Sequence, residues 1–144
     1  MKHPHILTVT LAAALLLAGC TSMPKINALE HQAAAEDQLP GGVTVWPEEE
    51  IPASSVRFLV EHNDIRYFGA KSADSQRACV AAFPKDSQAR WVAGCSDIRD
   101  DREIVHVSGT GVGETVLVSD GYDVDKLIDE GWNPIHHNVL IAGT

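Results

Sequence analysis

The chain has 144 residues, 44% of them hydrophobic, and a formal net charge of −9. This length allows one domain at most, and the composition is typical of a globular chain and not of a disordered one. Because Lys and Arg are the residues that bind a phosphate backbone, the acidic charge excludes nucleic acid as a partner.

The first residues have the pattern of an export signal. Met1-Lys2-His3 gives a short positive start, and Ile6–Leu17 is an almost continuous apolar run. The run is shorter than the about 20 apolar residues that cross a bilayer permanently, and its length is typical of the apolar part of a signal peptide. We therefore expect residues 1–19 to be a signal peptide.

The signal ends in Leu17-Ala18-Gly19-Cys20, which resembles the lipobox of bacterial lipoproteins at all four positions. The resemblance implies that a peptidase cuts before Cys20 and that the cysteine carries lipid, palmitate included. Two acyl chains anchor a protein stably, whereas one binds marginally. We expect a lipid-anchored protein at the extracytoplasmic face of the cell membrane. The alternatives are a plain secretory signal with an incidental cysteine, and an uncleaved helix.

Residues 20–53 are interpreted as the lipidated N-terminus and a flexible tether. Ala28–Gln38 is rich in helix formers, but its apolar positions are too sparse for firm docking. Pro40-Gly41-Gly42 would end any helix, Val43–Trp46 could pair with a sheet, and Pro47–Pro52 is acidic and flanked by prolines. A flexible chain of about 30 residues has a span near 30 Å, so we expect the tether to hold the domain clear of the headgroups.

Residues 54–144 are predicted to form a small β-rich domain. Apolar and polar residues alternate from Ser55 onward, which is the period of a half-buried strand, and turn residues separate the runs. A short late helix over Val124–Glu130 has Asp123 as its cap and Gly131 in the left-handed position after it. We expect a mainly β (α+β) fold: one small antiparallel sheet of about six or seven strands, at 56–60, 65–70, 77–83, 90–96, 104–108, 115–119 and 135–142. Trp132-Asn133-Pro134 is expected to be a turn, and the alanines of 77–83 leave a helix open there.

Lipid on Cys20 leaves one pair of cysteines in an exported domain, where disulfides persist. If Phe83 pairs with Trp91 across the turn after Pro84, Cys79 falls opposite Cys95 at a distance that a disulfide can bridge. The alternative is a redox or metal-binding pair. The long spacing is unlike Cys-x-x-Cys, and no third ligand lies nearby in the sequence.

His106, His136 and His137 are the weak candidates for a metal site. Adjacent residues of a strand point to opposite faces, so we expect His137 to share a face with Ile135 and His136 to lie on the other. A zinc site needs at least a third ligand, so we expect no metal and no cofactor.

Two other motifs are weaker. The run Gly109–Gly113 is interpreted as a turn, because no helix and no Lys-Ser/Thr pair follow it. Asp120, Asp123 and Asp125 have the wrong spacing for a calcium loop.

Two parts of the sequence together resemble a family of small exported proteins and lipoproteins of actinobacteria. They are Cys79…Trp91-Val92-Ala93-Gly94-Cys95 and the C-terminal run Val118-Ser119-Asp120-Gly121-Tyr122, Gly131-Trp132 and Asn138–Ile141. The resemblance covers most of Arg57–Ala142. Members often have Pro where this chain has Ser119. The resemblance implies no catalytic residues.

The function expected from the sequence is that of a non-enzymatic cell-surface lipoprotein. Its domain would bind or support another component of the envelope, a protein or the cell wall. The alternative is a small envelope enzyme or metal-binding protein that uses His106, His136 or His137. A pocket with two histidines and a carboxylate would favour the alternative, and an exposed apolar or aromatic patch would favour the binding module.

Overall fold

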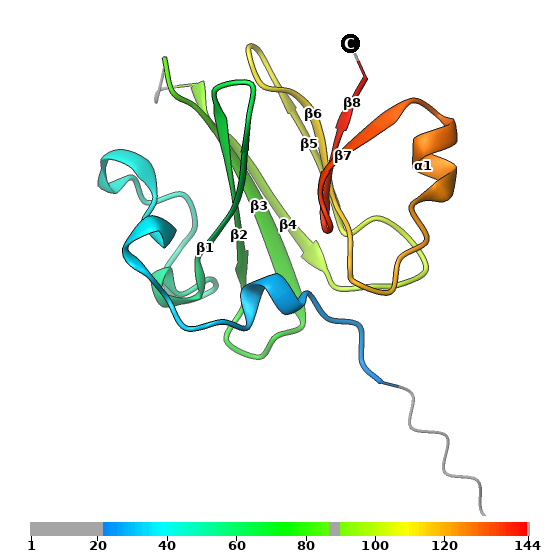
Figure 1. The fold of residues 1–144 in the computed structure, drawn as a ribbon. Helices are drawn as coiled ribbons and strands as arrows, with labels where there is room; N and C mark the ends of the chain where they lie inside the picture. The colour runs from blue at the N-terminus through cyan, green and yellow to red at the C-terminus, as the bar shows by residue number, and fades with distance from the viewer. Residues whose placement is uncertain (1–21, 87–89, 144) are drawn as a thin grey trace, which may run out of the picture.

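The computed structural model describes residues 22–86 and 90–143, and these form two packed antiparallel sheets (Figure 1). In the first sheet the strand order is β1-β2-β3-β4, with β1 at Arg57–His62, β2 at Ile65–Lys71, β3 at Arg77–Pro84 and β4 at Val92–Asp97. In the second the order is β5-β6-β8-β7, with β5 at Val105–Gly109, β6 at Gly113–Leu117, β7 at Trp132–His136 and β8 at Val139–Ala142. The helix α1 is Asp125–Asp129.

The core lies between the two sheets. Tyr67, Val80 and Ala82 of the first sheet meet Leu117 and Val139 of the second, and each of these side chains is buried. A second apolar cluster lies on the other face of the first sheet, and a third lies under α1. Both faces of the first sheet are therefore covered.

Strand β3 is the centre of this arrangement. It lies between β2 and β4, and every residue from Ala78 to Pro84 is buried. The alanines that left a helix open in the sequence occupy this strand. Their small side chains suit a strand that is packed on both faces.

The predicted β-rich fold is confirmed, but its single sheet of six or seven strands is wrong. Residues 22–86 and 90–143 form eight strands in two sheets. The additional strand arises because the segment expected as one strand from Ile135 to Ala142 is a hairpin. Trp132-Asn133-Pro134, expected as a turn, begins β7. Since β7 is an edge strand, the missing N–H of Pro134 is tolerated there.

The late helix and the glycine turn lie where they were predicted, but the predicted cap is wrong. The N-cap of α1 is Val124, which makes no side-chain cap hydrogen bond, and Asp123 lies one residue before it. Asp123 Oδ1 accepts the N–H of Asp125 at 3.1 Å, and Gly131 has φ +95°. The run Gly109–Gly113 connects β5 to β6 as a hairpin, with Gly111 at φ +83°.

The segment from Ile26 to Val56, called the strap from here on, is packed against the sheets. It contains four short 3₁₀ turns at Asn27–Leu29, Ala35–Asp37, Pro40–Gly42 and Ala53–Ser55. Ile26 and Leu29 are 2% exposed and belong to the core between the sheets, and Ile51 covers the outer face of the first sheet. The interpretation of this part as a flexible tether is therefore wrong, because Ile26, Leu29 and Ile51 are buried against the sheets.

Candidate functional site

The chain enters the fold at a polar cluster around Asp120. The N–H of Asp120 donates to the carbonyl of Lys25, and Asp120 Oδ2 accepts the N–H of Asn27, each at 2.9 Å. Asn138, which is 1% exposed, donates from Nδ2 to Asp120 Oδ1 at 2.7 Å and to the carbonyl of Val118 at 3.1 Å. One carboxylate thus joins the start of the strap to the second sheet.

The neighbouring loop is fixed to the same cluster. The hydroxyl of Ser119, which is buried, donates to Asp100 Oδ1. A Cβ at Gly121 would lie 3.0 Å from the Asp100 carboxylate, so a larger residue there would shift the Asp100 side chain by a few tenths of an ångström. Ser119, Asp120, Gly121 and Asn138 carried the family resemblance in the sequence, and the structure brings them together.

His136 and His137 lie beside this cluster. The expectation that His137 shares a strand face with Ile135 is wrong, because β7 ends at His136 and His137 lies in the hairpin turn. Its Nε2 is 3.8 Å from Asp120 Oδ1, and its side chain is 70% exposed. His136 Nδ1 accepts the N–H of Asn138 at 3.1 Å. Burial lowers the pKa of His136, and nearby His137 lowers it further against the opposing effect of Asp120.

His106 is on the outer face of the second sheet. Its Nε2 is 3.5 Å from Glu114 Oε2, and its ring meets that of Trp132 edge to face with centroids 5.2 Å apart. Among residues 22–86 and 90–143, no three His, Cys, Asp or Glu side chains are grouped to hold a metal ion. The three candidate histidines are therefore not assembled into one site.

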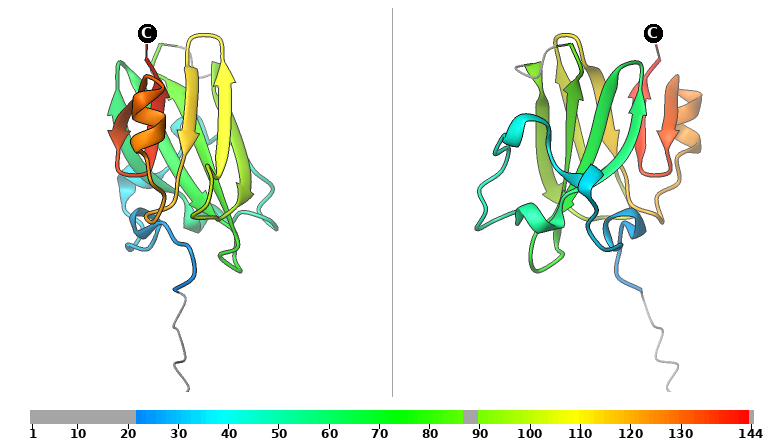
Figure 2. Two further views of the ribbon diagram at one scale, coloured as in Figure 1. Left: turned by 90° about the vertical axis from the view of Figure 1, so that its right-hand side faces the viewer. Right: turned by 60° about the vertical axis from the view of Figure 1, so that its left-hand side comes forward.

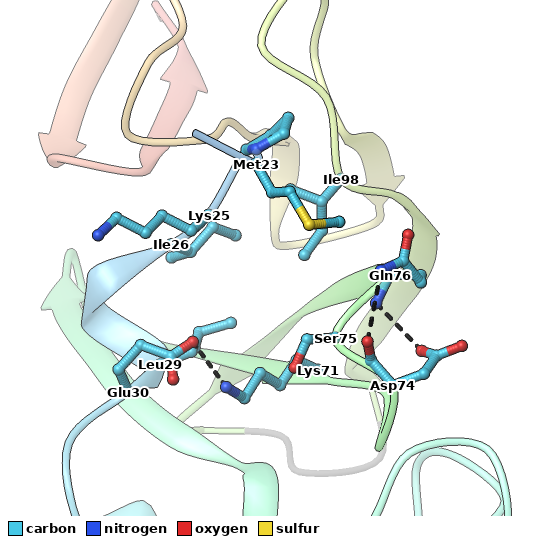
Figure 3. Close-up of a pocket in the computed structure, with 11 residues that line it drawn as sticks. Met23, Lys25, Ile26, Leu29, Glu30, Lys71, Asp74, Ser75, Gln76 and Ile98 are labelled. Carbon is cyan, nitrogen blue, oxygen red and sulfur yellow. Dashed lines mark hydrogen bonds and ion pairs between the residues drawn. The ribbon is translucent and has the colours of Figure 1, made fainter. Parts of the chain in front are cut away.

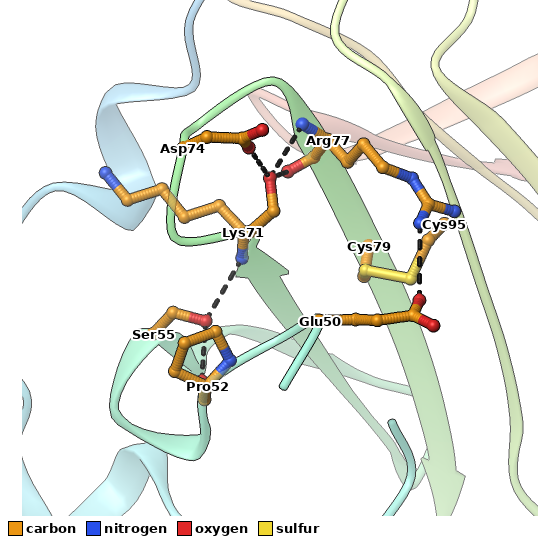
Figure 4. The surroundings of a disulfide bond; sticks show 9 residues. Glu50, Pro52, Ser55, Lys71, Asp74, Arg77, Cys79 and Cys95 are labelled. Carbon is orange, nitrogen blue, oxygen red and sulfur yellow. Dashed lines mark hydrogen bonds and ion pairs between the residues drawn. A yellow bond between two sulfur atoms is a disulfide. The ribbon is translucent and has the colours of Figure 1, made fainter. Parts of the chain in front are cut away.

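The predicted cysteine pair is a disulfide. Cys79 of β3 faces Cys95 of β4 with Cα atoms 4.0 Å apart, and Val80 faces Gly94 in the register expected from the sequence. The bond lies in the apolar cluster that also contains Phe83 and Trp91. Figure 4 shows the ion pair of Arg77 with Glu50, 3.4 Å apart, beside the disulfide. Cys20 lies outside the described residues.

A small pocket of about 280 Å³ lies where the chain enters the fold (Figure 3). Met23, Ile26 and Ile98 supply apolar lining. An ion pair between Lys71 Nζ and Glu30 Oε1, 2.6 Å apart, lies at its side. Met23 is 69% exposed, so an apolar side chain is presented to the surroundings at this end of the molecule.

A larger groove of about 700 Å³ is formed by the strap itself. Its apolar lining includes Leu39, Val43, Trp46 and Ile51, and its acidic lining is Asp37 and Glu48. The strap gave no periodic pattern in the sequence, so the groove could not be foreseen. The available signal was the run of alanines at 33–35 and the apolar residues of Val43–Trp46 in a segment interpreted as a linker.

Comparison with protein-family models, with curated proteins and with solved structures finds no match. Within the described ranges, no helix is long and apolar enough to cross a membrane.

Proposed function

We propose that the protein is a non-enzymatic lipoprotein of the cell envelope, anchored to the outer face of the membrane through lipid on Cys20. The lipobox-like Leu17–Cys20 supports the anchor. The Cys79–Cys95 disulfide supports an oxidising compartment, because such bonds persist outside the cytosol.

The observation that carries the proposal furthest is the position of the first core residue. Ile26 is 2% exposed and is six positions after Cys20. Six extended residues span at most about 22 Å. A lipid on Cys20 would therefore hold the domain close to the headgroups, and not at the distance of a long flexible tether.

The fold also supports an orientation for the anchored domain. The chain enters at the end of the sandwich that carries the Ser72–Gln76 turn and the loop between β4 and β5, whereas the C-terminus and the β5–β6 turn lie at the opposite end (Figures 1 and 2). The entry end would face the membrane. The opposite end would face outward and meet other envelope components.

Metabolic labelling with a palmitate analogue tests the anchor. We expect the wild-type chain to incorporate the label and to sediment with membranes, and the Cys20→Ala variant to lose the label. Ser22→Ala is the matched control, because it changes a neighbouring position and leaves the thiol in place. Equal labelling of wild type and Cys20→Ala would contradict the proposal.

A further inference from the structure

The groove in the strap is held open by buried polar contacts. Arg57, which is 8% exposed, donates from Nε to the carbonyl of His31 at 2.7 Å and from Nη1 to the carbonyl of Ser54 at 2.8 Å. The Asp37 carboxylate accepts the N–H groups of Ala34 and Phe58 at 2.8 and 2.7 Å. These contacts join both ends of the strap to β1, so the groove exists before a ligand arrives.

The groove has the size and lining of a ligand site. Its volume of about 700 Å³ lies in the range of ligand pockets, roughly 300–1,000 Å³. Small side chains at Ala33, Ala34 and Ala35 leave room along its wall. Trp46 also lines the groove, and its buried indole N–H has no acceptor within the described part of the chain.

The charged side chains that line the groove, Asp37 and Glu48, are both acidic. The strap contains no Lys or Arg, and its acidic residues are Glu30, Glu36, Asp37, Glu48, Glu49 and Glu50. Lys71 is paired with Glu30, and Arg77 with Glu50, both from the sheet. Glu48 lies in the groove lining itself, where its Oε2 accepts the N–H of Ala53 at 2.9 Å. A cationic ligand is attracted by this surface and an anionic one is repelled.

We propose that the groove binds a short, basic peptide segment of another envelope protein. Apolar side chains of the segment would enter between Val43, Trp46 and Leu39, while a Lys or Arg side chain would reach the carboxylate of Glu48. We infer a peptide from two features together. The apolar lining would bind apolar side chains, and the acidic groove lining would bind positively charged residues next to them in the same peptide. That the partner is an envelope protein rests on the proposed location, whereas the groove itself belongs to the folded part of the chain. A failed palmitate labelling and a failed peptide titration can therefore be told apart.

A binding titration with defined peptides tests the proposal. The protein extracted in detergent is titrated calorimetrically with a short capped peptide of alternating Lys and Val, and with its Glu and Val counterpart. We expect binding of the basic peptide only, weakened by added salt, with NMR shifts of the Ala33–Ala35 amides and of the Trp46 indole. The Glu48→Gln variant should weaken binding about threefold, from one lost charge contact.

Two further variants separate the groove from a general charge effect. Glu130→Gln removes one charge from the far side of the molecule, beside α1, and should leave the affinity unchanged. Ala35→Trp fills the groove from an exposed position and should abolish binding while the unfolding midpoint stays near that of the wild type. No binding of the basic peptide, equal binding of the acidic peptide, or shifts confined to residues outside the strap would each overturn the proposal. Concentration-dependent self-association through the same residues would also overturn it, since the occupant would then be a second copy.

Discussion

Replacing Leu29 by alanine distinguishes a packed strap from a flexible tether. Leu29 is 2% exposed and lies in the core between the sheets. It packs directly on β2, because a Cβ added to Gly69 would lie 2.7 Å from Leu29 Cδ2. Buried Leu→Ala changes cost about 2–5 kcal/mol, and the lower values belong to sites that can relax. Since the strap is irregular, we expect a loss of about 2–3 kcal/mol.

The assay is urea unfolding of the disulfide-intact protein, followed by Trp fluorescence. The midpoint should fall while the slope is unchanged, and the thermal midpoint should fall by about 3–5 °C per kcal/mol. Met23→Ala is the matched control, because Met23 is 69% exposed and its loss should cost less than about 0.5 kcal/mol. Equal stability of Leu29→Ala and wild type would refute the packing of the strap.

A double-mutant cycle sharpens the same prediction. Gly69→Ala should cost about 1–3 kcal/mol by overpacking, because the new methyl group meets Leu29 and Leu59. When Leu29→Ala is present, part of that clash is gone. We expect a coupling energy of at least about 0.5 kcal/mol between the two changes. Additive effects would mean that the methyl group added at position 69 does not contact Leu29.

Three other perturbations test separate parts of the structure. Cys79→Ala together with Cys95→Ala should lower the free energy of unfolding by about 3 kcal/mol, measured with urea. A reducing agent should lower the unfolding midpoint of the wild type but not that of this variant. Burial raises the pKa of Asp37, but the N–H groups that its carboxylate accepts and the nearby charges lower the pKa below its ordinary value overall. The carboxylate therefore stabilises the fold fully above the unfolded-state pKa of about 3.9, and this contribution is lost as pH falls through the lower folded-state pKa. In Asp37→Asn the free energy of unfolding should depend less on pH in this acidic range. Asp120→Ala removes the acceptor of two hydrogen bonds, leaves the buried Asn138 amide partly unpaired, and should lower the free energy of unfolding by about 2 kcal/mol. Amide hydrogen exchange of Asn27 should become faster, whereas Asp101→Ala, at an exposed loop position, should change neither the stability nor this exchange rate.

The strands of the first sheet could be predicted because each element carries its own local signal. The turn cluster His62-Asn63-Asp64 and the turn after Pro84 fix two hairpins, and Asn63 and Asp64 indeed have positive φ values of 48° and 59°. Once those hairpins are in place, the register puts Cys79 opposite Cys95. Local turn chemistry was therefore enough to predict the disulfide.

The last hairpin was missed because its signals conflict. Pro134 is typical of a turn, yet β7 is an edge strand, where a residue without an N–H is tolerated. The real turn is His137-Asn138. There, Asn138 is fixed by hydrogen bonds to Asp120 and Val118, residues that are distant in the sequence. Only the assembled sheet reveals why the chain reverses there.

The strap and its groove could not be predicted from pattern at all. Its 3₁₀ turns have no amphipathic period, and Ile26, Leu29 and Ile51 are buried in two different clusters. The strap is instead fixed by single long-range contacts, such as those of Arg57 to the carbonyls of His31 and Ser54. A segment with few apolar residues can thus be packed when those residues contact the surface of a sheet.

Energy transfer from the domain to labelled lipids tests the central claim that a short lipid anchor holds the entry end of the fold at the membrane. A fluorophore is attached at Asp101→Cys, in the loop of the entry end, or at Thr110→Cys, in the β5–β6 turn, in protein incorporated through its own anchor into vesicles. Strands of this length place the two positions roughly 20 Å apart along the sandwich. We expect clearly stronger transfer from position 101 than from position 110. Equal transfer, or stronger transfer from position 110, would contradict it.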